Sequence, residues 1–500
     1  MNSSNLLARN ARKYPNAEAV VSLGVRTSYK ELHKAVNKFA DSLKSLGITS
    51  GDKVVIFMPN VLEFVISYFA IQRIGAIVVP INAKFTQPEI EFIMEHADAK
   101  GIITHALIHG AAANIQQGDV KITTGEAGGA WHNFNQLLEA GRDEEISCDL
   151  HEDDLSTILY TSGTTGDPKG VLFTYRNILA VATMIAIEME VKPESRMLLM
   201  MPLSHSAPLH LFLMAGVMVG ATNVLTPTFT PQLLLETVSN EKTTHFFGAP
   251  VAYLLTASMP NISDYDLSSM QWWVYGGAPL SPKEVLMVSD KFKTDRLICV
   301  YGLTEAGPSG SILLADQHPQ LAGSIGTRAP FGTELRIIDD NGEDVAVSEI
   351  GEIVLFGEGN MRGYYKNEEA TAATFINGWL KTGDLARFDE DGAVWIVDRK
   401  KDVIISGGVN VYPKEIEDLI LQFEGVTEVA VVGVPHPQWG ETVKAIFAAK
   451  ELVNEEQLVN FLRKSLADFK VPKLFEQVDV LPRNASGKIL KQQLRKVEVE

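Results

Sequence analysis

The stretch TSGTTGDPKG at residues 161–170 carries the most information in this sequence. It packs three threonines, a serine and two glycines into six residues and continues with Asp-Pro-Lys-Gly. Glycines let the main chain approach a ligand closely, and hydroxyls and a lysine supply donors for anionic oxygens. The pattern predicts a phosphate-binding loop, but not a Walker A loop, because Pro168 precedes the lysine and Gly170 follows it. A flexible Ser/Thr/Gly linker is the alternative, and the rest of the chain has to decide between them.

The composition indicates a folded protein with several packed cores. The chain has 500 residues, of which 46% are hydrophobic, and a formal net charge of -18. No basic stripe accompanies that charge, so the sequence indicates no nucleic-acid partner. Cys148 and Cys299 lie far apart and form neither a disulfide framework nor a cysteine metal site. We therefore expect a reducing, cytoplasmic setting.

Three segments of the chain bear on secretion and membrane association. Residues 1–21 lack an uninterrupted apolar run, so we expect no secretory signal. The run LFLMAGVMVGA at 211–221 is too short to span a bilayer, and the run at 61–81 is interrupted by Glu63 and Arg73. Both runs are interpreted as core, and peripheral membrane contact stays open.

The N-terminal four-fifths of the chain shows the alternation of an α/β protein. Apolar residues recur at helical spacing over 32–43, behind Ser28 and Glu31, which match a capping box. The short apolar runs KVVIFM at 53–58 and AIVVPI at 76–81 predict strands on either side of a helix. The runs RMLLMMP, ATNVLTP and RLICVYG continue the alternation.

The composition changes at DRKKD, residues 398–402. After it we expect a helix from Pro413, strands at EVAVVGV and VKAIFAA, a helix around 456–467 and a strand near LFEQVDVL. These elements predict a small α+β unit of roughly 100 residues.

Six short motifs follow one another along the chain. They are LYTSGTTGDPKGV at 159–171, GGAPL at 276–280, YGLTE at 301–305, TGD at 382–384, DRKKD at 398–402 followed by ISGGVNVYPKEIE, and PRNASGKIL at 482–490. In this order they resemble the adenylate-forming superfamily, most closely its fatty acyl-CoA synthetases and 4-coumarate:CoA ligases. The resemblance implies an α/β enzyme that joins a carboxylic acid to CoA, uses ATP and Mg²⁺, and releases AMP and pyrophosphate.

The resemblance also implies a division of the chain. Residues 1–398 would form a large domain that binds ATP and the acyl group, 399–402 a hinge with Lys401 at its centre, and 403–500 a small mobile C-terminal lid.

Adenylation joins two anions, a carboxylate and the α-phosphate of ATP, so it needs hydrogen-bond donors and a divalent cation. The resemblance assigns the triphosphate to Thr161, Ser162, Gly163, Thr164, Thr165, Gly166 and Lys169, with Thr161 also among the catalytic residues. Glu305 would hold Mg²⁺ through a hard oxygen ligand and counts as catalytic. Without the other motifs, Thr304-Glu305 would be read as a solvated loop.

The resemblance assigns the nucleoside to a second set of residues. Adenine would lie between a wall formed by Gly277, Ala278 and Pro279 and the ring of Tyr301, next to Gly302 and Thr304. Asp384 would accept both ribose hydroxyls, and Arg399 would add a cation. The alternatives are a plain turn at TGD, core packing for Tyr301, and an ion pair of Arg399 with Asp398 or Asp402.

Lys488 is the implied catalytic lysine, which would bridge the substrate carboxylate and the α-phosphate. It would have to withdraw before CoA arrives, so relatives rotate the C-terminal domain about the hinge. Gly407 and Gly408 would then let the pantetheine arm of CoA pass close to the main chain. A simple connecting turn is the alternative for the two glycines.

The implied acyl pocket consists of His205, Ser206, Ala207, Gly276, Gly302 and Leu303, with His205 as a catalytic gate. Ser204 stands where relatives commonly carry an aromatic residue, and Ser206 and Ala207 are small. Such a pocket would accept an extended alkyl chain or a flat aryl group. TEAGP at 304–308 resembles the aryl ligases and ISGGVNVYP the fatty acyl enzymes. We expect a medium- or long-chain fatty acid, with a coumarate- or benzoate-like acid as the alternative.

Three further functions compete with an acid:CoA ligase. An amino-acid-activating domain would need an acidic residue for the substrate ammonium, and the segment 204–209 contains none. A luciferase-like oxygenase begins with the same adenylation, and a non-catalytic nucleotide-binding protein would keep only the fold. The sequence leaves the oligomeric state open.

Overall fold

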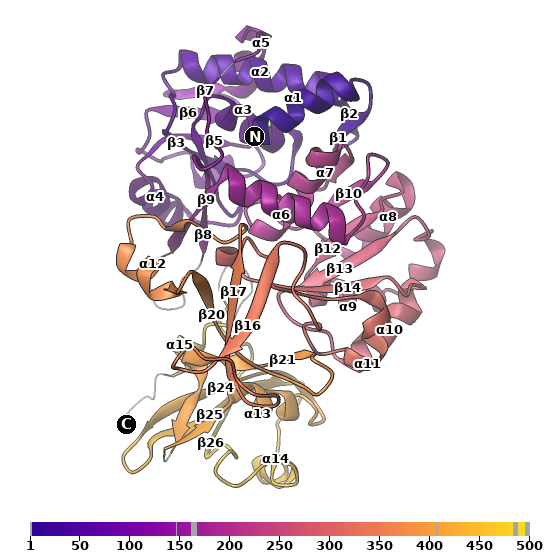
Figure 1. Cartoon of the computed structure of the whole chain (residues 1–500), viewed down its shortest axis with the longest axis vertical. Helices are drawn as coiled ribbons and strands as arrows, with labels where there is room; N and C mark the ends of the chain where they lie inside the picture. The colour runs from indigo at the N-terminus through magenta and orange to yellow at the C-terminus, as the bar shows by residue number, and fades with distance from the viewer. Residues whose placement is uncertain (1–2, 147, 162–167, 407, 484–488, 496–500) are drawn as a thin grey trace. The chain divides into compact units, whose positions relative to one another are not determined.

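The computed structural model describes residues 3–146, 148–161, 168–406, 408–483 and 489–495 (Figure 1). The chain divides into two compact units. The first holds the described residues up to Thr161, Pro168–Leu335 and Leu355–Leu380, and the second holds Arg336–Val354 and the described residues from Lys381 onward. This division by compactness differs from the predicted boundary at 398/399, and the hinge at 399–402 stays a prediction.

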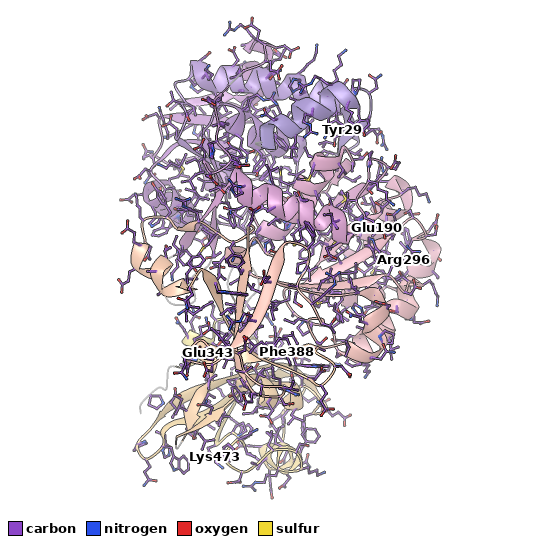
Figure 2. All side chains as sticks on the ribbon, in the orientation of Figure 1. Tyr29, Glu190, Arg296, Glu343, Phe388 and Lys473 are labelled. Carbon is purple, nitrogen blue, oxygen red and sulfur yellow. The ribbon has the colours of Figure 1, made fainter. Side chains whose placement is uncertain are left out.

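The predicted capping box begins α2, Tyr29–Ser45. The Ser28 backbone N–H donates to Glu31 Oε2 over 2.8 Å, and the Glu31 N–H donates to Ser28 Oγ over 3.3 Å. The first helical residue, Tyr29, is fully buried, and its hydroxyl donates to the Ala221 carbonyl over 2.6 Å (Figure 2). The N-terminal helix α1, Ser3–Lys13, packs beside α2 (Figure 1).

One eight-stranded sheet of the first unit has the order β18-β9-β8-β4-β3-β5-β6-β7. The predicted strands at 53–58 and 76–81 are its parallel neighbours β3, Lys53–Phe57, and β4, Ile77–Pro80, joined by α3, Leu62–Arg73. Its other elements are α4 Gln87–His96, β5 Ala99–Thr104, η1 His109–Ala111, β6 Val120–Thr123, β7 Trp131–Asn133, α5 Phe134–Ala140, β8 Leu155–Thr161, β9 Lys169–Thr174 and β18 Gly363–Tyr364. The antiparallel pairs β8–β9 and β9–β18 add an edge to a parallel sheet.

A second eight-stranded sheet has the order β15-β14-β13-β12-β10-β11-β1-β2. Its strands are β1 Glu18–Ser22, β2 Val25–Ser28, β10 Arg196–Leu199, β11 Thr222–Leu225, β12 His245–Gly248, β13 Trp272–Gly276, β14 Leu297–Tyr301 and β15 Ser311–Leu313. The accompanying helices are α6 Tyr175–Glu188, η2 Ala207–Leu213, α7 Met214–Val219, α8 Pro231–Glu241, α9 Pro250–Ala257, η3 Ile262–Asp264, α10 Pro282–Phe292, η4 Thr304–Ala306, η5 Ala315–Gln317 and α11 His318–Leu321. The strands predicted at RMLLMMP, ATNVLTP and RLICVYG are β10, β11 and β14.

A third sheet has the order β16-β17-β20-β19, with β21 paired to β20. Its elements are β16 Thr333–Ile338, β17 Gly351–Gly357, α12 Glu368–Thr374, β19 Phe375–Ile376, β20 Trp379–Phe388 and β21 Val394–Arg399, followed by the 3₁₀ turn η6 Lys400–Asp402.

The last sheet has the order β23-β22-β25-β24, with β26 beside β25, and confirms the predicted α+β unit. Its elements are β22 Ile404–Ser406, β23 Val409–Val411, α13 Pro413–Ile420, β24 Val426–His436, β25 Gly440–Ala449, α14 Glu455–Leu462, β26 Leu474–Gln477 and α15 Lys491–Leu494. Aliphatic side chains of β24, β25, α13 and α14 form its core.

Both apolar runs at 61–81 and 211–221 are buried in the first unit, as predicted. Across the described ranges, no helix has the length and apolar character needed to cross a membrane. Cys148 and Cys299 are both free thiols.

Candidate active site

The β8–β9 hairpin flanks the stretch TSGTTGDPKG at residues 161–170. Thr161, the last residue of β8, pairs with Lys169, the first residue of β9, and Thr161 Oγ1 donates to the Lys169 carbonyl over 3.5 Å. Gly170 is required by packing, because a Cβ there would lie 2.9 Å from Ile158 Cγ2 and 3.2 Å from Tyr160 Cζ. The predicted phosphate-binding residues Ser162, Gly163, Thr164, Thr165 and Gly166 lie outside the described residues, so their role stays a prediction.

Lys169 and Glu305 approach the same tyrosine. The short strand β18 pairs antiparallel with β9 and places Tyr364 opposite Val171. Lys169 Nζ lies over the Tyr364 ring, 5.0 Å from its centroid, and the Tyr364 hydroxyl donates to Glu305 Oε1 over 2.9 Å. Burial, reinforced by the Glu305 carboxylate, raises the pKa of Tyr364, so its phenol is protonated at neutral pH and acts as a donor.

The surroundings of Glu305 fit a magnesium ion that arrives with phosphates. Glu305 lies in η4, directly after β14. Within the part of the chain that the structure describes, no three His, Cys, Asp or Glu side chains cluster as a metal cage. Mg²⁺ is commonly held by one or two carboxylates together with substrate phosphates and water, rather than by an all-protein cage. A single glutamate near the hairpin that is predicted to bind phosphates matches that donor set.

The predicted adenine-binding residues lie at the carboxyl ends of two adjacent parallel strands, β13 and β14. After β13, Gly277 has φ +85° and is exposed together with Ala278, while Pro279 is half-buried. At the end of β14, Tyr301 is 9% exposed. Ligands of α/β sheets commonly bind at this edge.

Two glycines at this edge are required by close backbone approach. A Cβ on Gly276 would lie 2.6 Å from the Val300 carbonyl oxygen, and one on Gly302 would lie 2.1 Å from the Pro308 carbonyl oxygen. Leu303 and Thr304 follow, both half-buried.

The predicted acyl segment leads into a π-helical turn, η2. Ser206 Oγ lies 3.5 Å from Thr304 Oγ1, so this segment adjoins the YGLTE motif, and Ala207 is the first residue of the turn. His205 is exposed, and desolvation by the surrounding protein lowers the pKa of its ring. The fully buried His210 has no hydrogen-bond partner for either ring nitrogen within the described ranges, and burial lowers its pKa to about 3.

A narrow apolar crevice adjoins this segment. It is lined by Met184, Ile185, Leu211, Val300, Tyr301, Pro308, Ser309, Gly310, Ser311, Ile312 and Pro330. The lining shares Tyr301 with the predicted nucleotide site but contains none of the six predicted acyl-pocket residues, whose role stays a prediction. Leu211 and Pro308 belong to runs quoted from the sequence, 211–221 and 304–308, but neither residue was assigned to the acyl pocket.

In the second unit, Asp384 and Arg399 form a direct ion pair. They are opposite each other in the β20–β21 register, and Arg399 Nε lies 2.6 Å from Asp384 Oδ1. Neither pairing considered from the sequence is the one seen: Asp398 Oδ1 accepts the backbone N–H of Arg399, and Asp402 pairs with Arg495. TGD is part of β20 rather than a free turn, although its central Gly383 has φ +72°.

Glu352 on β17 supports this strand from the side. Its Oε1 accepts the Gly383 N–H over 3.0 Å, and its Oε2 lies 3.2 Å from Lys400 Nζ. The Glu352 side chain is only 10% exposed. Glu352 and Tyr364 are the two residues of these clusters that the sequence motifs did not reveal.

The predicted hinge and lid residues are only partly described. Lys401 lies in η6, and its carbonyl accepts from Arg495 Nη2 over 3.3 Å. Gly408 has φ +81°, and a Cβ there would meet no atom within 4 Å. Gly407 and Lys488 lie outside the described residues, and the chain on either side of Lys488 is joined by a bridge between Arg483 and Ile489.

Comparison with known proteins gives a consistent result. The AMP-binding enzyme family matches residues 7–365, and the AMP-binding enzyme C-terminal domain matches residues 415–488. The chain is 35% identical to a feruloyl-CoA synthase from an Amycolatopsis species over 492 residues, which cover 98% of this chain and 97% of that protein. It is also 35% identical to the long-chain-fatty-acid–CoA ligase FadD13 of Mycobacterium tuberculosis over 494 residues, with the same coverage of 98% and 97%.

Among solved structures, the chain is similar to the O-succinylbenzoate coenzyme A synthetase of Bacillus subtilis in complex with ATP and magnesium ion. The TM-score is 0.88 at 29% identity, and the match covers 98% of this chain and 99% of that one.

Proposed function

The chain belongs to the AMP-binding enzyme family, among its ATP-dependent acid:CoA ligases, and from that premise we propose that its acid is a medium- or long-chain fatty acid. The observation that supports this substrate is the pair of small residues Ser206 and Ala207, in the segment that contacts Thr304 of the YGLTE motif. Small side chains leave room for an acyl chain, and a longer chain is favoured over a short acid because each buried methylene contributes about 0.8 kcal/mol.

The first half-reaction activates the acid. A carboxylate oxygen attacks the α-phosphorus of ATP, the bond between the α-phosphorus and the bridging oxygen breaks, and pyrophosphate leaves. We assign the triphosphate to Thr161, Lys169 and the loop between them. Lys488 would offset the charge shared between the carboxylate and the α-phosphate.

Glu305 would hold Mg²⁺, which supplies charge neutralisation for the triphosphate when it is bound. Tyr301 and the Gly277–Pro279 segment would hold adenine, and Asp384 would accept the ribose hydroxyls with Arg399 at its side.

The second half-reaction transfers the acyl group. The CoA thiolate attacks the acyl carbon, the bond from that carbon to the AMP oxygen breaks, and AMP leaves. We propose that Lys401 is the hinge and that Gly407 and Gly408 line the path of pantetheine, since glycines permit close approach to the main chain. The free thiols agree with the proposed reducing, cytoplasmic location.

A panel of acids tests the proposal. Acid-dependent ATP–pyrophosphate exchange should be measured with acetate, octanoate, palmitate, benzoate, cinnamate and ferulate. Octanoate and palmitate should exceed acetate in kcat/KM, and the nucleotide product should be AMP. Equal efficiency with acetate and octanoate would exclude the fatty-acid assignment, and ADP formation would exclude adenylation.

An aryl acid is the second candidate. Identity to the feruloyl-CoA synthase equals that to the fatty-acid ligase, and the TEAGP run resembles aryl ligases. Higher kcat/KM for cinnamate or ferulate than for octanoate would favour it.

A further inference from the structure

Tyr364 separates two opposite charges. On one side its ring face lies under Lys169 Nζ, and on the other its hydroxyl donates to Glu305 Oε1. In the described ranges neither Lys169 nor Glu305 forms an ion pair with another side chain, and Tyr364 is the partner that they share. The lysine and the glutamate therefore both contact Tyr364, which carries no charge.

The main chain fixes the tyrosine against both partners. The Met361 N–H donates to the Glu305 carbonyl over 2.8 Å, and the Tyr365 N–H donates to the Gly170 carbonyl over 2.8 Å. These two bonds flank Tyr364 and tie β18 to the turn that carries Glu305 and to the strand that carries Lys169. The backbone of Tyr364 is thus held next to both segments.

A neutral spacer has a chemical advantage here. A direct ion pair would neutralise Lys169 and Glu305, and a triphosphate with its cation would have to break that pair before using either group. An aromatic face attracts an ammonium, and a phenol donates to a carboxylate, without cancelling the charge of either one.

We propose that Tyr364 is a positioning residue for adenylation, which keeps Glu305 oriented toward the metal and Lys169 toward the phosphates while preventing the two from pairing. This inference rests on the proposed metal role of Glu305. In the positioning role, the Tyr364 hydroxyl affects the binding of the cation, whereas the Tyr364 ring affects the binding of the phosphates.

Two substitutions separate these effects. Tyr364→Phe removes the donor to Glu305 and keeps the ring under Lys169, so metal affinity should weaken about tenfold, the lower end of the range for losing a partner of a metal ligand. Tyr364→Leu also removes the ring under Lys169. It should therefore lower the affinity for nucleotide measured without metal, which Tyr364→Phe should leave unchanged.

The measurement does not depend on turnover. Binding of Mn²⁺ to the full-length protein with α,β-methylene-ATP is followed by the electron paramagnetic resonance signal of free Mn²⁺, and nucleotide binding without metal is followed by calorimetry. Tyr365→Phe is the matched control, because the Tyr365 hydroxyl also donates to a carboxylate, Asp98 Oδ2, over 3.0 Å. That variant should bind Mn²⁺ as the wild type does.

Glu305→Gln separates the positioning role of Tyr364 from the metal role of Glu305. If Glu305→Gln weakens Mn²⁺ binding and Tyr364→Phe does not, the positioning role is wrong and the proposed metal role stands. If Glu305→Gln binds Mn²⁺ normally, the metal role fails and the inference fails with it. Should Tyr364→Phe unfold, Tyr364→His keeps a ring and an N–H donor, and wild-type Mn²⁺ affinity in that variant would support the donor role while a tenfold loss would overturn it.

Discussion

In the first unit Lys169 and Glu305 contact the same tyrosine and not each other, whereas in the second unit Arg399 Nε lies 2.6 Å from Asp384 Oδ1. The Asp384 side chain is 6% exposed and that of Arg399 is 39% exposed. A cationic side chain and a carboxylate are thus kept apart by Tyr364 in the first unit and form a direct ion pair in the second unit.

The difference follows the charge of the proposed ligands. Ribose hydroxyls are neutral, and a carboxylate that is already paired still accepts their hydrogen bonds while its cation fixes its orientation. A triphosphate and a divalent cation need protein charges that have not been cancelled. Paired residues therefore suit a neutral ligand group, and separated residues suit a charged one.

The largest expected effect concerns Lys488, the cation proposed to act only in the first half-reaction. Lys488→Ala should slow acyl-adenylate formation by roughly 10²–10³, the scale for losing one well-placed charge-stabilising donor. Thioester formation from synthetic acyl-adenylate and CoA should change little. Pyrophosphate release without CoA measures the first step, and thioester yield measures the second.

Lys491→Ala is the control for Lys488→Ala, because Lys491 Nζ is paired with Glu417 Oε1 at 2.7 Å. It should leave both steps near the wild-type rates. A parallel loss of both steps in Lys488→Ala would contradict a lysine that serves adenylation alone.

Breaking the paired arrangement is the next test. Asp384→Asn removes the charged acceptor, so kcat/KM for ATP should fall about 10- to 100-fold, since hydrogen bonds to charged groups contribute about 1.5–3 kcal/mol. The KM for the acid should change less. Steady-state kinetics with varied ATP provides the measurement.

Asp389→Asn is matched to that change, because Asp389 follows β20 and its Oδ2 accepts from Trp395 Nε1 over 2.6 Å. Its kcat/KM for ATP should stay close to wild type. An unchanged KM for ATP in Asp384→Asn would show that Asp384 does not hold the ribose.

Local signals made much of the fold predictable. β3, β4, β10, β11 and β14 are short apolar runs, and the helix after Ser28 begins with a capping box, so each is encoded by residues near in sequence. The α+β unit was predicted for the same reason.

The partners within the candidate site were not predictable in this way. Arg399 has Asp398 and Asp402 as sequence neighbours, but the antiparallel register of β20 and β21 brings Asp384 to it instead. Tyr364 contacts Lys169 and Glu305, and the three residues lie in three separate segments of the chain, β18, β9 and η4. No local motif therefore contains all three. Strand register and long-range packing decide such contacts, and a linear pattern does not report them.

A third group of the first unit, the fully buried His210, is held without charge. His210 has a native pKa of about 3 against about 6.5 for an unfolded histidine, so between these values the unfolded state binds the extra proton. Its contribution to stability therefore falls as the pH drops below about 6.5, by at most about 1.4 kcal/mol per pH unit.

His210→Leu removes this dependence and two unpaired buried nitrogens. The variant should lose less stability than the wild type between pH 7.5 and 5.5, by about 1.4 kcal/mol. Urea unfolding at the two pH values measures the difference. An identical pH dependence would mean that the pKa of His210 is the same in the native and unfolded states.

The smallest expected effect concerns the support of the paired cluster. Glu352→Gln keeps an oxygen that can accept the Gly383 N–H but removes the charge facing Lys400, whose Nζ also lies 2.8 Å from Asp340 Oδ1. We expect the KM for ATP to rise about threefold and the free energy of unfolding to fall by about 1 kcal/mol, the scale of one ordinary hydrogen bond, because the glutamine keeps an acceptor for the Gly383 N–H.

Asp340→Asn removes a charge from the same lysine, but the Asp340 side chain is 90% exposed against 10% for Glu352. Exposed ion pairs contribute little, so this variant should match the wild type in both measurements. If the two variants raise the KM for ATP equally, the charge of Lys400 matters and the contact with Gly383 does not. If neither raises it, Glu352 does not position the TGD segment, and the Asp384–Arg399 pair is held by the strand register alone.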